Sequence, residues 1–186
     1  MEHLSDKEIL DLFRAGNRDK AFRALVDIHG KTVYNIALFT LNDESMADDV
    51  TQESYIKIYR NLEKFKGDSK LSTWMYRIVK NACYDAAKKR HFGPVDEMEE
   101  LDLRDPDGFS PDEDALIHWR QEELRDAVEQ LPVNQRLAIT LYYFQDKSYE
   151  DVAAIMGLPL NTLKSHLHRA KTSLAHALIH LEGSPV

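Results

Sequence analysis

The residues best suited to chemistry form a run of small polar and cationic side chains between Asn161 and Arg169. At helical spacing they occupy one outward face, opposite an apolar stripe. Hydroxyl, imidazole and cationic groups placed in this way bind phosphates and base edges. The outward set comprises Thr162, Lys164, Ser165, His166, His168 and Arg169, and the apolar stripe comprises Leu163, Leu167, Ala170, Leu174, Leu178 and Leu181.

A shorter helix is predicted immediately before this run. Ser148 is a suitable N-terminal cap, and Gly157 favours a left-handed stop. Pro159 prevents continuation and Asn161 is a good cap for the second helix. The apolar face of the first helix consists of Tyr149, Val152, Ala153 and Met156. The pair is typical of a DNA-binding helix-turn-helix, although an ordinary helical hairpin with a solvated face fits the same stretch.

A second candidate nucleic-acid surface follows a predicted loop at residues 66–69, which Asp68 or Ser69 could terminate as a cap. The helix expected from about residue 70 to residue 90 has an inward apolar stripe and an outward cationic one. Trp74 and Tyr76 stand near its start, and cations with aromatic planes suit single-stranded nucleic acid. The alternative is that Trp74 belongs to the core and the lysines are solvated. The outward stripe consists of Arg77, Lys80, Asn81, Tyr84 and Lys88.

The helix predicted from Asp43 to Phe65 carries a mixed stripe that does not belong to its buried side. The stripe consists of Asp49, Gln52, Glu53, Ile56 and Arg60. One isoleucine with a polar rim fits a protein-docking surface, but a solvated helix face fits as well. Residues 5–42 predict two scaffold helices with a break at Gly16-Asn17, and residues 120–144 predict helix interrupted at Pro132.

Charge divides the 186-residue chain, whose formal net charge is −8. Residues 93–119 hold ten acidic side chains and one arginine, whereas residues 57–90 hold ten Lys or Arg and three acids. The distribution of charge, rather than the total, reveals a nucleic-acid surface. We therefore predict an all-α protein with two small helical domains, residues 1–92 and 120–186, joined by a flexible acidic linker at residues 93–119.

Several classes of function are disfavoured. The sequence has no HxE motif with paired cysteines, no clustered carboxylates at metal spacing and no glycine-rich phosphate loop, so we expect no enzyme, cofactor or metal. His176 and His180 have metal-ligand spacing but no acidic or cysteine partner. Cys83 in an apolar pattern indicates a buried thiol. The charged N-terminus and the lack of a long apolar run predict a cytoplasmic protein without membrane insertion.

Two blocks of the sequence resemble a known family. DDVTQESYIKIYRNLEKFKGDSKLSTWMYRIVKNACYDAAKKR is similar to the second conserved region of bacterial sigma factors, and LPVNQRLAITLYYFQDKSYEDVAAIMGLPLNTLKSHLHRAKTSL is similar to the fourth. Because no third region lies between them, the chain resembles the extracytoplasmic-function group. The resemblance implies a factor that binds RNA polymerase core and directs promoter recognition and DNA melting. An anti-sigma factor is an expected further partner.

The resemblance also implies roles for individual residues. The family docks on the polymerase clamp helices through the positions matched by Asp49, Gln52, Glu53, Ile56 and Arg60. It captures a flipped base of the minus-ten element in the loop matched by Phe65, Lys66, Gly67, Asp68 and Ser69, and reads neighbouring bases from the helix that carries Arg77, Lys80, Asn81, Tyr84 and Lys88. It reads the minus-thirty-five element through positions matched by Asn161, Thr162, Lys164, Ser165, His168 and Arg169.

One departure and one alternative accompany this interpretation. Family members often have arginine where this chain has Lys164 and His166, and lysine lacks the two-pronged contact of arginine with guanine. A different or weaker minus-thirty-five preference is therefore expected. The alternative function is a free-standing helix-turn-helix regulator, which would require dimerisation, yet the sequence has no sustained coiled-coil heptad.

Overall fold

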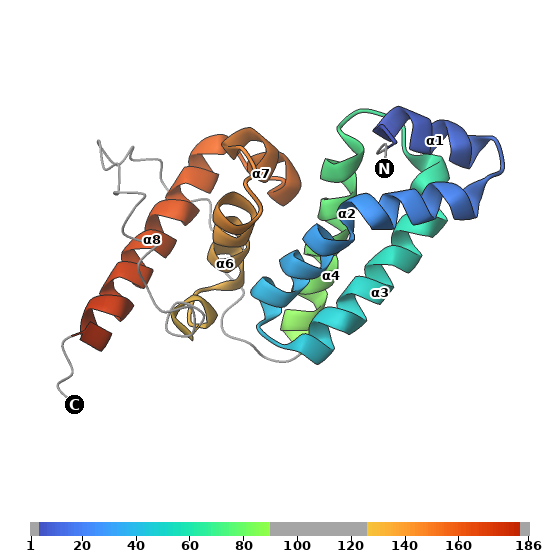
Figure 1. The fold of residues 1–186 in the computed structure, drawn as a ribbon. Coiled ribbons are helices and arrows are strands. Elements are labelled where there is room, and N and C mark those ends of the chain that lie inside the picture. The colour runs from blue at the N-terminus through green and yellow to red at the C-terminus, as the bar shows by residue number, and fades with distance from the viewer. Residues whose placement is uncertain (1–3, 90–125, 183–186) are drawn as a thin grey trace.

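The computed structural model describes residues 4–89 and 126–182, with side chains described through Ala177. Within these residues every regular element is a helix and none is a strand. Figure 1 shows two bodies, one built from α1 to α4 and the other from α6 to α8. The predicted all-α class with two helical bodies is confirmed. The predicted acidic linker, residues 93–119, lies outside the described residues.

The helices of the N-terminal body begin and end at clear sequence signals. Ser5 and Glu8 form a reciprocal capping box at the start of the first helix, and Asn42 ends the second with a positive φ of 49°. The side chain of Asp43 accepts a hydrogen bond from the backbone N–H of Met46 at 2.9 Å, which caps the third. The elements are α1 (Asp6–Arg14), α2 (Arg18–Leu41), α3 (Glu44–Asn61), the 3-10 helix η1 (Leu62–Lys64) and α4 (Leu71–Lys89).

The apolar stripes of these helices meet in a dense core. Ile9, Leu25, Ile58 and Met75 come from four different helices and are fully buried or nearly so. Full burial of a side chain of this size contributes about 1.5–3 kcal/mol. Cys83 is also fully buried, as predicted, and burial raises the pKa of its thiol to about 12.

Two local predictions between α3 and α4 are wrong. The helix expected to reach Phe65 leaves α-helical geometry after Asn61 and continues as the 3-10 turn of η1. The start of α4 is not capped by Asp68 or Ser69. Instead the backbone N–H of Leu71 donates to Oδ2 of Asp6, 3.3 Å away on α1. A contact between segments so distant in sequence leaves no local signature.

The C-terminal body contains the predicted helix-turn-helix. Ser148 caps its first helix by accepting from the N–H of Asp151 at 3.1 Å, and Gly157 ends that helix with a φ of 73°. The second helix buries Leu163, Leu167, Ala170 and Leu174, as its stripe predicted. After a helical turn at residues 126–129, the elements are α6 (Val133–Ile139), the π-helix η3 (Thr140–Phe144), α7 (Tyr149–Met156) and α8 (Leu160–Glu182).

Two predictions in this body need correction. The helix expected from Gln135 to Phe144 begins earlier, at Val133, and widens into π-helical geometry from Thr140. Asn161 does not cap α8, because the helix already begins at Leu160. The carbonyl of Pro159 accepts from the N–H of Leu163 at 3.0 Å, so the first turn starts at the proline.

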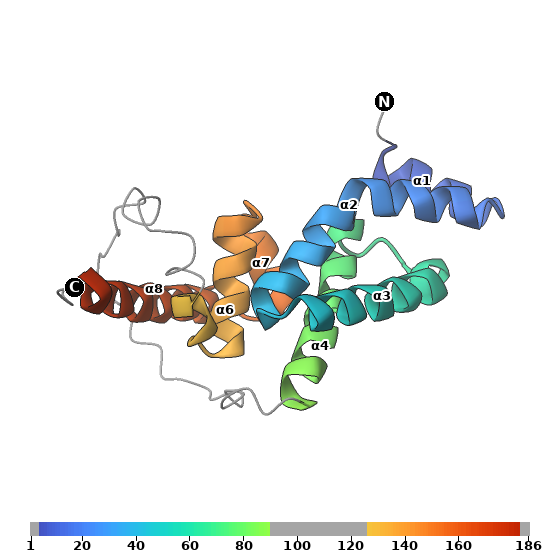
Figure 2. The ribbon, with the colours of Figure 1, turned by 60° about the horizontal axis from the view of Figure 1, so that its bottom comes forward.

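The two bodies pack directly against each other. The principal contacts join α4 to α7 and α2 to α6, and η3 also lies against α2. The two views in Figures 1 and 2 agree in placing α6 and α7 beside α2 and α4, with α8 on the outer side. None of the helices in the described ranges is long and apolar enough to span a membrane.

Candidate nucleic-acid and polymerase interfaces

The loop before α4 begins at a buried residue, Phe65, and its next three residues are exposed. Phe65 is only 7% exposed and its ring packs on Trp74, with centroids 5.5 Å apart. Lys66, Gly67 and Asp68 are exposed, and Gly67 has a φ of 84°, a conformation that side chains rarely adopt. Of the predicted loop residues, Phe65 therefore anchors the loop in the core, while the three residues after it are accessible.

The outward stripe of α4 lies along one side of the helix, as its spacing predicted. We call Arg77, Lys80, Asn81, Tyr84 and Lys88 the α4 face. Arg77, Asn81 and Lys88 are exposed, whereas Lys80 and Tyr84 are partly buried. Nζ of Lys80 lies 5.6 Å from the ring centroid of Tyr84, and burial, followed by the nearby charge of Arg77, lowers the pKa of Lys80.

The two aromatic residues at the start of α4 have different environments. Trp74 is partly buried, so it is neither a fully solvated ring nor a fully enclosed core residue. Tyr76 is only 2% exposed and its hydroxyl lies 3.1 Å from Nδ1 of His29, so its ring belongs to the core and cannot stack on a base in this structure. Burial raises the pKa of the Tyr76 phenol, and burial likewise lowers the pKa of the His29 imidazole.

Part of the α4 face is engaged by the C-terminal body. Nε of Arg77 donates to the carbonyl of Ala154 at 2.7 Å, and Nζ of Lys80 donates to the carbonyl of Met156 at 3.2 Å. The hydroxyl of Tyr84 donates to Oδ1 of Asn134. These partners could not be predicted from the sequence, because each hydrogen bond joins residues at least fifty positions apart.

The first half of α8 presents the second candidate surface. Its predicted DNA-facing residues, which we call the α8 face, are Asn161, Thr162, Lys164, Ser165, His168 and Arg169. Asn161, Lys164 and Arg169 are exposed, and the other three are partly buried. The hydroxyl of Ser165 donates to the carbonyl of Asn161 at 3.1 Å, so this side chain is held close to the helix. The face lies on the helix expected to enter a major groove.

The mixed stripe of α3 lies on the exposed side of the helix. The structure exposes Asp49, Gln52, Glu53, Ile56 and Arg60, which we call the α3 stripe. Ile56 is 52% exposed, an unusual position for a large apolar side chain beside charged ones. Glu53 forms an ion pair with Lys57 at 2.7 Å, and this hydrogen bond lowers the pKa of the Glu53 carboxyl.

Sequence reasoning missed Arg136, which lies at the junction between the bodies. The residue is only 4% exposed, although arginine is almost never buried without partners. Nη1 donates to the carbonyl of Thr40 at 2.8 Å, and Nη2 donates to the carbonyls of Glu129 at 2.8 Å and Leu131 at 2.9 Å. Burial lowers the pKa of Arg136, and Glu129 opposes that shift. Only its place among apolar residues hinted at burial.

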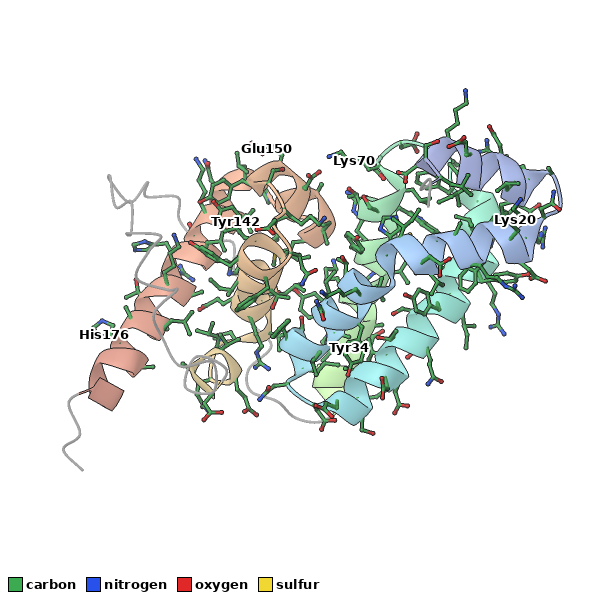
Figure 3. All side chains as sticks on the ribbon, viewed as in Figure 1. Lys20, Tyr34, Lys70, Tyr142, Glu150 and His176 are labelled. Atoms are coloured by element: carbon green, nitrogen blue, oxygen red, sulfur yellow. The ribbon has the colours of Figure 1, made fainter. Side chains whose placement is uncertain are left out.

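The described side chains offer no metal centre. No group of three histidine, cysteine, aspartate or glutamate side chains converges among the residues for which side chains are described. His176 is exposed on α8, on the side away from the N-terminal body (Figure 3). The side chain of His180, its candidate partner, lies outside the description.

Comparison with known proteins assigns both bodies to one class. The family model for sigma-70 region 2 matches residues 25–92, and that for sigma-70 region 4 matches residues 121–174. The chain is 32% identical to the RNA polymerase sigma-H factor of Pseudomonas aeruginosa in an alignment 181 positions long that covers 93% of each protein. It is 33% identical to the ECF RNA polymerase sigma-E factor of Escherichia coli K12, over 93% of this chain and 94% of that protein.

A solved structure agrees with these matches. The sigma factor RpoE of Bartonella quintana, crystallised with the anti-sigma factor NepR, is 25% identical, with a TM-score of 0.65 over 86% of this chain and 97% of that one. The chain belongs to the extracytoplasmic-function sigma factors, and its function is promoter recognition in transcription initiation. These matches do not favour the free-standing regulator.

Proposed function

We propose that three surfaces of the chain divide the work of a sigma factor. The α3 stripe docks on RNA polymerase core. The loop at residues 65–69 and the α4 face bind and help to open the minus-ten element. The α8 face reads the minus-thirty-five element. The division between the two DNA-binding parts follows the domain boundaries expected from the sequence, residues 1–92 and 120–186.

The observation that carries this proposal is the separation of an exposed apolar anchor from two cationic helix faces. Ile56 stands among acidic and polar side chains on α3, which suits a protein partner with a complementary rim. The α4 and α8 faces combine cations with amide and hydroxyl groups, which suits phosphates and base edges. Flipping a base costs a few kcal/mol, which stacking and edge hydrogen bonds offset.

The residues on α8 also support a prediction about which minus-thirty-five sequence the chain prefers. Lys164 is exposed and reaches a base as a single charged group, without the planar fork of arginine. Relatives with arginine at this position can contact both major-groove acceptors of a guanine at once. We therefore expect this chain to prefer guanine less strongly at the contacted position of the minus-thirty-five element.

The substitution Ile56→Asp tests the docking surface. It places a charge at the apolar anchor, and because Ile56 is half exposed the fold should survive. Binding to core polymerase, measured with purified proteins, should be lost while the helical circular dichroism spectrum is unchanged. Lys20→Asp, which changes the charge by more, is a control at an exposed position of the same body outside the α3 stripe, on α2 (Figure 3). Retained core binding by Ile56→Asp would place docking elsewhere.

Three broader expectations belong to the same proposal. The chain acts without catalysis of its own, since it supplies recognition and strand opening to the polymerase. It works in the cytoplasm, where the polymerase is. A relative was crystallised with an anti-sigma factor, and we extend such a partner to this chain, where it would restrain the two DNA-binding faces.

A further inference from the structure

We propose that Leu160, which belongs to none of the three surfaces above, is a specificity residue for the minus-thirty-five element. Its side chain contacts the C5-methyl group of a thymine in the major groove. This inference rests on the role proposed for the α8 face, and it adds one apolar reader to that polar set.

Leu160 is one of a small group of exposed large apolar side chains. Among the described residues these are Ile56, Phe144 and Leu160. Ile56 is the apolar anchor of the α3 stripe, and the ring of Phe144 stacks on that of Phe39 with centroids 4.8 Å apart. A single exposed leucine is ordinary on a protein surface, so its exposure alone assigns nothing. The place of Leu160 on α8 carries the inference.

That place separates Leu160 from the buried stripe of its own helix. Leu160 precedes Leu163 by three residues and Leu167 by seven, a spacing that would put all three on one apolar face. Leu163 and Leu167 are 0% and 3% exposed, whereas Leu160 is 37% exposed. The stripe is therefore buried only from Leu163 onward, and the first turn of α8 carries its leucine at the surface.

The same helix aligns Leu160 with the α8 face. Residues four apart are neighbours on a helix surface, and Lys164 and His168 follow Leu160 at steps of four. Leu160 is the first residue of α8, and a helix-turn-helix places the N-terminal residues of its second helix on base edges. The helix lies on the outer side of the C-terminal body (Figure 2), where DNA can reach it.

The chemistry of an aliphatic side chain limits what it can read. Leucine neither donates nor accepts hydrogen bonds, whereas the C5-methyl group of thymine offers an apolar contact in the major groove. Asn161 and Lys164 can read donors and acceptors, so a methyl contact adds discrimination that they lack. Thr162 also carries a methyl group and is partly buried. The experiment must therefore distinguish Leu160 from Thr162.

The helix geometry restricts which thymine is contacted. Leu160 and Lys164 are separated by about 6 Å along the helix axis, at 1.5 Å per residue. Successive bases of one strand are separated by about 3.4 Å. The thymine should therefore lie within about two base pairs of the position that Lys164 contacts.

The test uses the full chain bound to core polymerase and a minus-thirty-five sequence selected by that complex from a randomised promoter library. Each thymine of either strand is replaced in turn by deoxyuridine, which lacks only the C5-methyl group. One such replacement should weaken promoter binding by the wild type about four-fold, the factor that corresponds to one buried methyl-sized group. Leu160→Ala should weaken binding to the thymine promoter at least as much, and uridine at that position should then cost nothing further.

Two control variants accompany Leu160→Ala. Leu160→Met keeps an apolar side chain of similar volume and should retain the sensitivity to uridine. Phe144→Ala removes an equally exposed apolar side chain of the same body, outside α8, and should also retain it. Because Leu160 is exposed, the helical circular dichroism spectrum and core binding of Leu160→Ala should match those of the wild type.

Three results would overturn the assignment. The first is a selected element without thymine on either strand. The second is uridine sensitivity that is equal in the wild type and in Leu160→Ala, as a contact from Thr162 would give. The third is a sensitive thymine more than about two base pairs from the position at which Lys164→Ala changes the preference.

Failure of the proposed function has a different outcome. If α8 does not read the minus-thirty-five element, Lys164→Ala leaves the selected sequence unchanged, as Leu160→Ala does. If the α8 face reads the element without Leu160, Lys164→Ala changes the selected sequence and Leu160→Ala does not.

Discussion

The α4 and α8 faces have similar chemistry and opposite environments. Both combine cations with hydrogen-bonding side chains on one side of a long helix. On α4, Arg77 and Lys80 donate to carbonyls at the end of another helix of the same chain, whereas Lys164 and Arg169 on α8 are exposed and make no such contact between the two bodies in the described part of the chain. The difference shows that cations proposed to bind a polyanion can find partners at the carbonyl end of a helix in the same chain, since both offer oxygen acceptors and negative potential.

The largest effect is expected at the buried residue that joins the two bodies. Arg136→Met should leave the carbonyls of Thr40, Glu129 and Leu131 without their donor, which costs about 3 kcal/mol in the free energy of unfolding. Urea denaturation measures this cost. Arg169→Met on the open α8 face is the control and should change stability by less than about 0.5 kcal/mol. Equal losses for the two variants would show that the buried bonds contribute nothing.

The next effect concerns the open face. Lys164→Ala or Arg169→Ala should cost about 1–3 kcal/mol of discrimination among minus-thirty-five sequences where the side chain contacts a base, or lower the salt dependence of binding where it contacts phosphate. Binding of the polymerase complex to promoter variants at several salt concentrations distinguishes these outcomes. Lys20→Ala is the control, and it should change neither the discrimination among sequences nor the salt dependence of binding. Unchanged affinity, salt dependence and footprint would refute the placement of α8 on DNA.

A smaller effect is expected at the start of α7, the helix that packs against both α8 and α4. Ser148→Ala removes the side-chain acceptor for the N–H of Asp151 and should cost about 1 kcal/mol of stability. Ser5→Ala is the matched control at the start of α1, where Ser5 has the same role. Hydrogen exchange should show weaker protection of α7 amides in Ser148→Ala only. Equal protection in both variants would mean that this cap does not stabilise α7.

The smallest effect is a pH dependence close to the covered face. Burial lowers the pKa of His29, and Lys147 adds to that shift while Asp6 opposes it. Because the unfolded chain then binds more protons, the His29 contribution to stability is complete above the ordinary imidazole pKa and declines as the pH falls toward the lowered value in the fold. His29→Gln should flatten this part of the pH profile of unfolding. A slope that persists in His29→Gln would assign the effect to carboxyl groups.

The sequence predicted the parts of the fold that depend on neighbours along the chain. Ser148 and Gly157 bound α7, and the stripe from Leu163 to Leu174 faces inward, because capping and helical periodicity are local properties. The outward positions of the α3 stripe and much of the α8 face followed from the same periodicity.

What the sequence could not predict depends on distant partners. The carboxylate of Asp6 accepts a hydrogen bond from the N–H of Leu71, 65 residues along the chain. Arg136 donates a hydrogen bond to the carbonyl of Thr40, 96 residues away. The π-helix at residues 140–144 also lacked a signal, since its apolar residues fit an α-helix equally well. The covering of the α4 face therefore emerged only from the folded chain.

One distance measurement tests most directly the central claim that the α4 face, engaged by α7 in the free chain, binds promoter DNA. Spin labels at Lys64→Cys on η1 and Glu150→Cys on α7 would report the separation of the bodies, and both positions are exposed. The native Cys83 should not be labelled, because its thiol is buried and has a pKa raised to about 12. We predict one short, narrow distance distribution for the free chain and a longer one when core polymerase and promoter DNA are bound. The same distribution in both states would contradict the account.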